Sequence, residues 1–196
     1  MQRVSARGVF VVVLLVCMPM VVQAKCDDPA KPEVEWPDCN KAGVDLQGAN
    51  LELAEMEGAN LAGANLEKAN LKAVGLRSVN LQGARLAGAN LEGALLNRAD
   101  LRKADLTGAD LDVADLADTN LEFAKLDGAR LTTVHLRGAR LRGATLKGAR
   151  FAGALLEGAN LEGADLTGAD FRDADLDGAI WSDGRICAAG SKGVCK

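Results

Sequence analysis

Residues 59–73 read ANLAGANLEKANLKA, and the triplet Ala-Asn-Leu recurs within them at intervals of five residues. The same period continues without insertion or deletion from residue 44 to residue 178, which makes 27 pentads. Leu occupies 24 of the 27 central positions, and Ala occupies 22 of the 27 positions two residues before the centre. Two residues after the centre, Gly occupies 16 of the 27 positions. This repeat determines the fold, because no other pattern covers as much of the chain.

A period of five residues fits neither of the regular elements. An α-helix repeats about every 3.6 residues and a flat strand repeats about every 2 residues. The chain must therefore turn within each pentad, so that the centre and the residue two before it both point inward. Gly after the centre suits a corner where the backbone has a positive φ angle. Stacked turns of this kind predict a β-solenoid in which each coil contacts only its neighbours.

This pattern resembles that of the pentapeptide-repeat family, A-(D/N)-L-x-x, over about two thirds of the chain. The resemblance implies an all-β fold: a right-handed quadrilateral β-helix with four pentads in each coil and about seven coils in all. At about 4.8 Å per coil, such a pentapeptide-repeat solenoid would be roughly 33 Å tall. Charges alternate at a spacing of four pentads in Arg102, Glu122, Arg142 and Glu162. Separations of three and five pentads also pair opposite charges, so the coil length rests on the resemblance alone.

Residues 1–24 have the features of a secretory signal peptide. Arg3 and Arg7 precede an apolar run over residues 9–22, and Ala24 is the small residue at the expected cleavage point. This run is shorter than the ~20 residues that span a bilayer. Cys17 raises the alternative of a lipid anchor, but the preceding residue is the bulky Val16. We therefore expect a chain that is exported to the periplasm or outside the cell and does not span the membrane.

Four cysteines remain outside both the signal peptide and the repeat, and export favours their oxidation to disulfides. Cys26 and Cys39 precede the repeat, whereas Cys187 and Cys195 follow it. The solenoid would hold the two pairs about 30 Å apart, beyond the reach of a disulfide, so each pair is expected to close within its own end. The chain then divides into a signal peptide (1–24), an N-terminal lead-in and cap (25–43), the repeat (44–178) and a C-terminal cap (179–196).

Two tryptophans are expected to cover the ends of the core. Trp36 lies two pentads before the centre Leu46, and Trp181 lies one pentad after the centre Leu176, so both are in register with the centres. A large side chain at such a position would close an otherwise open end of the solenoid. The alternative is an exposed aromatic binding site at each end.

The sequence contains little that points to catalysis. His135 is the only histidine, and the four-pentad coil would place Ser78 three coils away from it, too far for a nucleophile and its base. Residues 173–178 resemble the start of a calcium-binding loop, but Gly184 stands where that loop needs a bidentate Glu. The cysteines are divided between the ends without a histidine beside them, which argues against zinc. We therefore expect no enzymatic activity, no cofactor and no bound metal.

Charge is distributed in blocks along the repeat. Residues 105–122 contain six acids and no bases, and residues 157–177 contain seven acids and one base. A basic girdle lies between them and consists of Lys125, Arg130, Arg137, Arg140, Arg142, Lys147 and Arg150. These cations either compensate neighbouring acids on a solvated surface or form an anion-binding contact around Arg140. A net charge of −4 and a pI near 5.1 argue against a general nucleic-acid binder.

These features favour a non-enzymatic, exported scaffold that presents the polar faces of a rigid solenoid to another protein or to an envelope component. Solenoids offer broad surfaces and few pockets, which suits binding. The sequence leaves a monomer and an end-to-end dimer open. The resemblance also implies an alternative, a DNA-mimic-like binder of a type II topoisomerase, as in cytoplasmic members of the family. The signal peptide and the interruption of the acidic surface by the girdle argue against this alternative.

Overall fold

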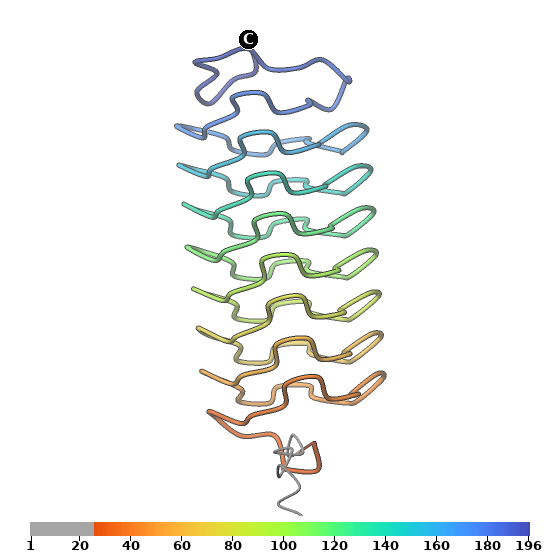
Figure 1. Cartoon of the computed structure of the whole chain (residues 1–196). Coiled ribbons are helices and arrows are strands. Elements are labelled where there is room, and N and C mark those ends of the chain that lie inside the picture. The colour runs from red at the N-terminus through yellow and green to blue at the C-terminus, as the bar shows by residue number, and fades with distance from the viewer. Residues whose placement is uncertain (1–25) are drawn as a thin grey trace, which may run out of the picture.

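The computed structural model describes residues 26–196, so the expected signal peptide lies outside the described residues. Residues 26–196 form one column of stacked coils, with the N-terminal coils at one end and the C-terminal segment at the other (Figure 1). These residues form no α-helix and no strand longer than a single residue. Instead, each pentad contributes one β-bridge residue. Nowhere in this part of the chain is there a helix suited to crossing a membrane.

Each coil contains four pentads. Along the repeat the bridges are parallel and join residues that lie four pentads apart, as Asp105 is joined to Lys125. Around such a bridge the backbone makes two hydrogen bonds: Leu106 N–H donates to Lys125 O at 2.7 Å, and Lys125 N–H donates to Ala104 O at 2.9 Å. This winding gives the four-pentad coil that the resemblance implied and that the charges alone did not select.

The core is a solid stack of the two inward positions of each pentad. Ala104 and Leu106 are both fully buried, as are the equivalent residues through the middle of the column. The inward direction predicted from the five-residue period is thus confirmed. Each fully buried Leu side chain contributes on the order of 1.5–3 kcal/mol through the hydrophobic effect. Thr119 is the one polar residue among the Ala positions of the repeat; it is fully buried, and its hydroxyl donates to Leu96 O at 2.9 Å.

The outward residue before each centre explains why Asn and Asp recur there. Its side-chain oxygen accepts a hydrogen bond from the backbone N–H two residues later, as Asn120 Oδ1 does from Glu122 N at 3.1 Å. Asp100 Oδ1 accepts in the same way from Arg102 N at 3.1 Å. Such short side-chain-to-backbone bonds stabilise a turn directly after the bridge.

All 27 corner positions of the repeat have a positive φ angle, whichever residue occupies them. Gly108 has a φ of 64°, and the bulky residues Val113 and Phe123 are held at 56° and 59°. This conformation strains residues that carry a Cβ atom, and most of all β-branched ones. The coil geometry therefore imposes the corner, and Gly is frequent there because it adopts the corner without strain.

The stacked bridges give the column four faces, which we number in chain order. Face 1 carries Asp45, Asn65, Arg85, Asp105, Lys125, Thr145 and Asp165. Face 2 carries Asn50, Asn70, Asn90, Asp110, Arg130, Arg150 and Asp170. Face 3 carries Glu35, Glu55, Gly75, Leu95, Asp115, His135, Leu155 and Asp175. Face 4 carries Asn40, Asn60, Asn80, Asp100, Asn120, Arg140, Asn160 and Ile180.

A disulfide lies at each end of the column. Cys26 is joined to Cys39 with their Cα atoms 5.5 Å apart, and Cys187 is joined to Cys195 with their Cα atoms 4.8 Å apart. Each bond closes a short loop, with a sequence separation of 13 at the N-terminal end and 8 at the C-terminal end. The pairing is thus within each end.

Aromatic side chains lie at both ends of the core. Trp36 is almost fully buried at the N-terminal end. At the C-terminal end, Phe151 and Phe171 stack with ring centroids 4.7 Å apart, and Trp181 meets Phe171 edge-on at 5.1 Å. Trp181 is only partly buried, because the chain turns back at this point instead of adding another coil. The returning segment pairs antiparallel with the last coil, at Ile180 with Ile186 and at Asp175 with Lys192.

Candidate functional site

The predicted basic girdle is a ring around the column. Its seven residues extend from all four faces, so they do not gather on one side of the molecule. Lys125 and Lys147 belong to face 1, Arg130 and Arg150 to face 2, Arg137 to face 3, and Arg140 and Arg142 to face 4. No flat partner could therefore contact the whole girdle at once.

Five of the seven girdle cations pair with carboxylates of adjacent coils. The pairs are Lys125 with Asp105 at 3.8 Å, Arg130 with Asp110 at 2.9 Å and with Asp112, Arg137 with Glu157 at 3.1 Å, Arg142 with Glu162 at 3.7 Å and Lys147 with Asp165 at 3.3 Å. Within residues 26–196, Arg140 and Arg150 form no ion pair. Most of the girdle is thus compensated on the surface, where such pairs contribute little to stability.

Arg102 departs from the charge ladder suggested by the sequence. Its guanidinium group binds Asp100 in the same pentad, with Nη2 2.6 Å from Oδ2 and Nε 2.9 Å from Oδ1, and it forms no ion pair with Glu122. Two parallel hydrogen bonds of this kind are the preferred arrangement of arginine with a carboxylate. The hydrogen bonds from Arg102 lower the pKa of Asp100 below its usual value.

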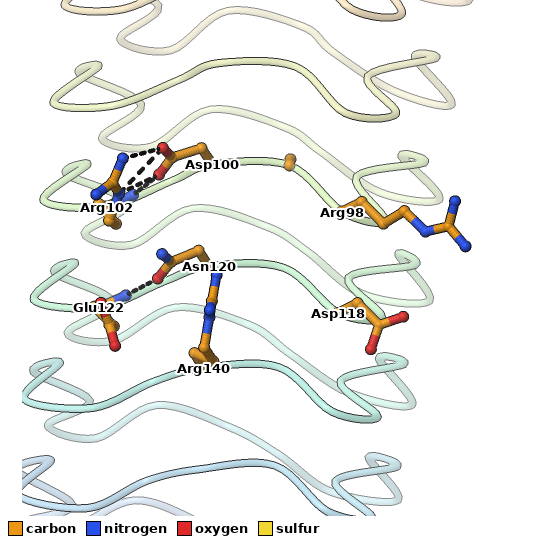
Figure 2. Close-up of a pocket in the computed structure, with 8 residues that line it drawn as sticks. Arg98, Asp100, Arg102, Asp118, Asn120, Glu122 and Arg140 are labelled. Carbon is orange, nitrogen blue, oxygen red and sulfur yellow. Dashed lines mark hydrogen bonds and ion pairs between the residues drawn. The ribbon is translucent and has the colours of Figure 1, made fainter.

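An open polar hollow lies on face 4 beside this pair. It has a volume of about 410 Å³ and is lined by Arg98, Ala99, Asp100, Arg102, Asp118, Asn120, Glu122 and Arg140. Figure 2 shows the Arg140 side chain reaching from its own coil towards Asn120. Arg98 and Asp118 lie at the other side of the same view. Within residues 26–196, neither Arg98 nor Arg140 forms an ion pair, so the hollow presents two unpaired guanidinium groups, and that of Arg140 lies beside the Asn120 amide.

A second hollow, of about 350 Å³, lies on face 3 around the only histidine. It is lined by Asp115, Ala117, His135, Arg137 and Leu155. His135 bridges to Asp115 on one side and to Leu155 on the other. The lining includes no Ser, Thr or Cys, so His135 has no nucleophile to activate there. In the described residues, no cluster of three or more His, Cys, Asp or Glu side chains could hold a metal ion.

Sequence reasoning singled out Arg140 but missed the residues beside it. Asn120 and Asp100 lie one and two coils earlier in the chain, and they reach the same hollow only because a coil contains four pentads. Searching the sequence for polar residues at this spacing would have found them once the coil length was known. The coil length itself carries no local signal in the sequence.

Comparison with known proteins identifies the repeat. The family model for pentapeptide repeats matches eight copies, over residues 42–74, 76–112, 114–151 and 146–180. No curated protein is similar enough in sequence to match the chain. Solved structures do match, with 34 chains at a significant level.

Three of these structures illustrate the range of sequence identity and structural similarity. HetL, a pentapeptide-repeat protein involved in heterocyst differentiation regulation in the cyanobacterium Nostoc sp. strain PCC 7120, is 39% identical, and the match covers 81% of this chain and 77% of HetL with a TM-score of 0.35. A thylakoid-lumen protein of Arabidopsis thaliana is 33% identical over 55% of this chain and 68% of its own, with a TM-score of 0.46. QnrB1, a plasmid-mediated fluoroquinolone resistance protein, is 26% identical over 78% of this chain and 74% of its own, with a TM-score of 0.63.

Pentapeptide-repeat proteins fold as right-handed quadrilateral β-helices and generally act as structural or protein-binding modules. The family model covers well over half of the chain, and the likeness to QnrB1 extends to the three-dimensional fold. The column of four-pentad coils is the architecture that this repeat produces. This chain belongs to the pentapeptide-repeat family.

Proposed function

We propose that this protein is an exported, non-enzymatic scaffold that binds another protein through the polar faces of its column. The observation that carries the proposal is the solid apolar core, whose inward positions leave only the outer surface for contact with other molecules. The hollow on face 4 is open and lined largely by charged or amide side chains, and the hollow on face 3 combines Asp115, His135 and Arg137 with the apolar residues Ala117 and Leu155. Such surfaces suit recognition of a protein better than binding of a small apolar ligand.

Face 4 is the part of the surface best suited to this contact. Arg140 has no carboxylate partner in the described chain, and arginine is among the residues that contribute most to protein interfaces. Asp100 is already paired with Arg102, so within the described chain the hollow retains the guanidinium groups of Arg98 and Arg140 without an ion pair. A partner carboxylate bound to Arg140 would complete this arrangement.

Site-specific photo-crosslinking tests the proposal. A benzophenone amino acid is introduced at Asn120 on face 4 or at the matched position Asn90 on face 2, and each protein is irradiated in the producing cells. We expect the Asn120 probe to give a crosslinked protein, and Arg140→Ala should reduce the yield of this product severalfold. The Asn90 probe should not give it. If neither position yields a crosslinked protein, face 4 is not a binding surface.

Export is a separate part of the proposal and needs its own measurement. Mass spectrometry of the protein from the exported fraction should give a mature chain that begins at Lys25. The intact N-terminus in the cytoplasmic fraction would contradict export. It would also reopen the alternative of a topoisomerase binder, for which a supercoiling assay is decisive. We expect no inhibition of supercoiling at micromolar concentrations of the mature protein.

A further inference from the structure

The strand edge of the last coil is open on face 1. One coil below, Leu146 N–H donates to Asp165 O at 2.9 Å, and Gly148 N–H donates to Thr167 O, also at 2.9 Å. Asp165 N–H in turn donates to Ala144 O at 3.0 Å. This pattern of two donors and one acceptor holds every coil to the next on this face.

The equivalent groups in the last coil are the N–H groups of Leu166 and Gly168 and the carbonyl oxygen of Ala164. Within residues 26–196, none of the three has a backbone partner. Leu166 is also partly exposed. In the coils between the first and the last, the central Leu residues of face 1, such as Leu146, are fully buried. The edge therefore combines unpaired backbone groups with an exposed core position, which makes it a template for another strand.

The C-terminal segment covers the other three faces of this end. On face 4, Cys187 N–H donates to Ala179 O at 2.8 Å. On face 3, Leu176 N–H donates to Ser191 O at 2.9 Å. On face 2, the N–H groups of Phe171 and Asp173 also have no backbone partner within residues 26–196, but Gly193 covers them: a Cβ atom at Gly193 would be 3.2 Å from Phe171 O and 3.3 Å from Asp173 N, and the Phe171 side chain is buried. Face 1 is left uncovered at this end.

Ile186 is in register to close this edge, but it pairs with another residue instead. Ile186 follows Leu166 by four pentads, which is the spacing of stacked centres. The chain turns at Gly184, where φ is 85°, and Ile186 pairs antiparallel with Ile180 and remains 70% exposed. The face 1 edge is thus free to bind a strand from outside the molecule.

We propose that residues 164–168 bind an extended segment of a partner protein in parallel register, in which Lys or Arg immediately precedes Leu or Ile. The basic residue would lie over Asp165 and the aliphatic residue over Leu166. A precedent lies on the same face, where Lys125 bridges to Asp105, its Nζ lies 3.8 Å from the Asp105 carboxylate, and the next residue, Leu126, enters the core. Asp165 already pairs with Lys147 of the coil below at 3.3 Å, so an incoming cation would share its carboxylate with Lys147. A second copy of this edge would instead bring another Asp165 carboxylate, so charge favours a basic segment from a different protein.

This inference rests on the proposed role as a protein-binding scaffold, and it names the chemistry of one partner segment. It is tested with the oxidised protein and a capped peptide of sequence Ala-Lys-Leu-Asp-Gly-Ala, which is that of residues 124–129. Binding is followed by the backbone amide signals of Leu166 and Gly168 in NMR spectra. We expect saturable shifts at these two amides and none at the matched amides of Leu146 and Gly148.

Two modified peptides test the register. Methylation of the Lys backbone nitrogen removes the N–H group that would face Ala164 O, so it should abolish the shifts. Methylation of the Leu backbone nitrogen is the matched control, because Leu126 N–H points away from the coil below and donates to Thr145 O at 2.7 Å. This second peptide should bind as well as the unmodified one.

Charge reversal tests the chemistry of the partner. A peptide with Glu in place of Lys should bind about fivefold more weakly, and the Asp165→Lys protein should reverse that preference. Equal binding of the Lys and Glu peptides would overturn the inference, as would the absence of shifts at millimolar peptide. Shifts that depend on protein concentration without peptide would also overturn it, since they would indicate a second copy at this edge. None of these results depends on crosslinking at face 4, so the two proposals fail separately.

Discussion

Lys192 in the C-terminal segment forms an ion pair and hydrogen bond with Asp175 in the last coil. The two residues also share an antiparallel bridge, so the contact fastens the returning segment to face 3. The hydrogen bond from Lys192 lowers the pKa of Asp175 and raises the pKa of Lys192. The end of the column is therefore held by charge as well as by the nearby disulfide.

Asp175→Asn should loosen this end without unfolding the column. Removing the charge weakens the contact with Lys192, and we expect amide exchange at Leu176, whose N–H binds Ser191 O, to become about fivefold faster. Asp183→Asn is the matched control, because its pairing with Arg185 at 3.5 Å lies in an exposed turn. Equal acceleration by both variants would mean that the Lys192 contact does not hold the cap.

Acid should destabilise the protein only below about pH 4. The folded-state pKa values of Asp100, Asp170 and Asp175 are lowered by hydrogen bonds from Arg102, Arg172 and Lys192, respectively. Because the unfolded-state pKa of Asp is about 3.9, the stabilisation is fully present above that pH and is lost as pH falls through the lower folded-state values. The urea concentration at the unfolding midpoint should be measured from pH 7 to pH 2. It should decrease once the pH is lower than about 4. A midpoint that rises on acidification would contradict this assignment.

The loss of stability caused by a core substitution should depend on its position along the column. Leu106→Ala in the middle leaves a cavity with coils on both sides, and we expect a loss of about 3 kcal/mol in the free energy of unfolding. Leu166→Ala at the open edge removes a partly exposed side chain and should cost about 1 kcal/mol. Chemical denaturation followed by circular dichroism measures both. Equal losses would mean that Leu166 is covered in solution.

Corner substitutions to Gly should stabilise the protein where a branched residue is strained. Val113 has a φ of 56° and an exposed side chain, so Val113→Gly should raise the free energy of unfolding by about 1 kcal/mol. Ala152 lies before a corner and is not among the residues with positive φ, so Ala152→Gly should instead lower it by about 0.5–1 kcal/mol. Denaturation curves of the two variants should give changes of opposite sign in the free energy of unfolding. A lower free energy of unfolding in both variants would refute the strain at Val113.

Removing the C-terminal disulfide should expose the end of the core. Cys187 and Cys195 close a short loop, and replacing both by Ser should cost about 2–3 kcal/mol at that end. Hydrogen exchange should accelerate from the last coil onwards while Leu106 in the middle stays protected. If exchange accelerates equally throughout the column, the coils unfold as one unit, and the disulfide does not act locally.

The repeat alone predicted most of the architecture. Leu106 and Ala104 are buried because the chain turns once per pentad, and that turn is implied by any apolar period of five. The positive φ angle at Gly108 follows from the same turn. The cysteine positions outside the repeat likewise indicated that each end would be closed within itself.

The tertiary structure decided which charged side chains meet between one coil and the next. Arg102 binds Asp100 in its own pentad, whereas Arg142 binds Glu162 in the next coil, although both follow a centre on face 4. Which carboxylate each cation meets depends on the coil length and on side-chain direction, and charge pairs spaced by three, four or five pentads fit the sequence almost equally well. For the same reason, the sequence did not show that Arg140 lacks an ion-pair partner in the described chain.

The sequence by itself determined which residues face the core and where the backbone turns, because both depend on contacts within a pentad. Only the tertiary structure decided that Ile186 turns away from Leu166 and leaves the face 1 edge open. The register of the repeat placed Ile186 over that edge, but antiparallel pairing with Ile180 and the bond between Cys187 and Cys195 held the segment elsewhere. The physical reason is that the end of a solenoid is set by competition between long-range pairings, which no five-residue pattern encodes.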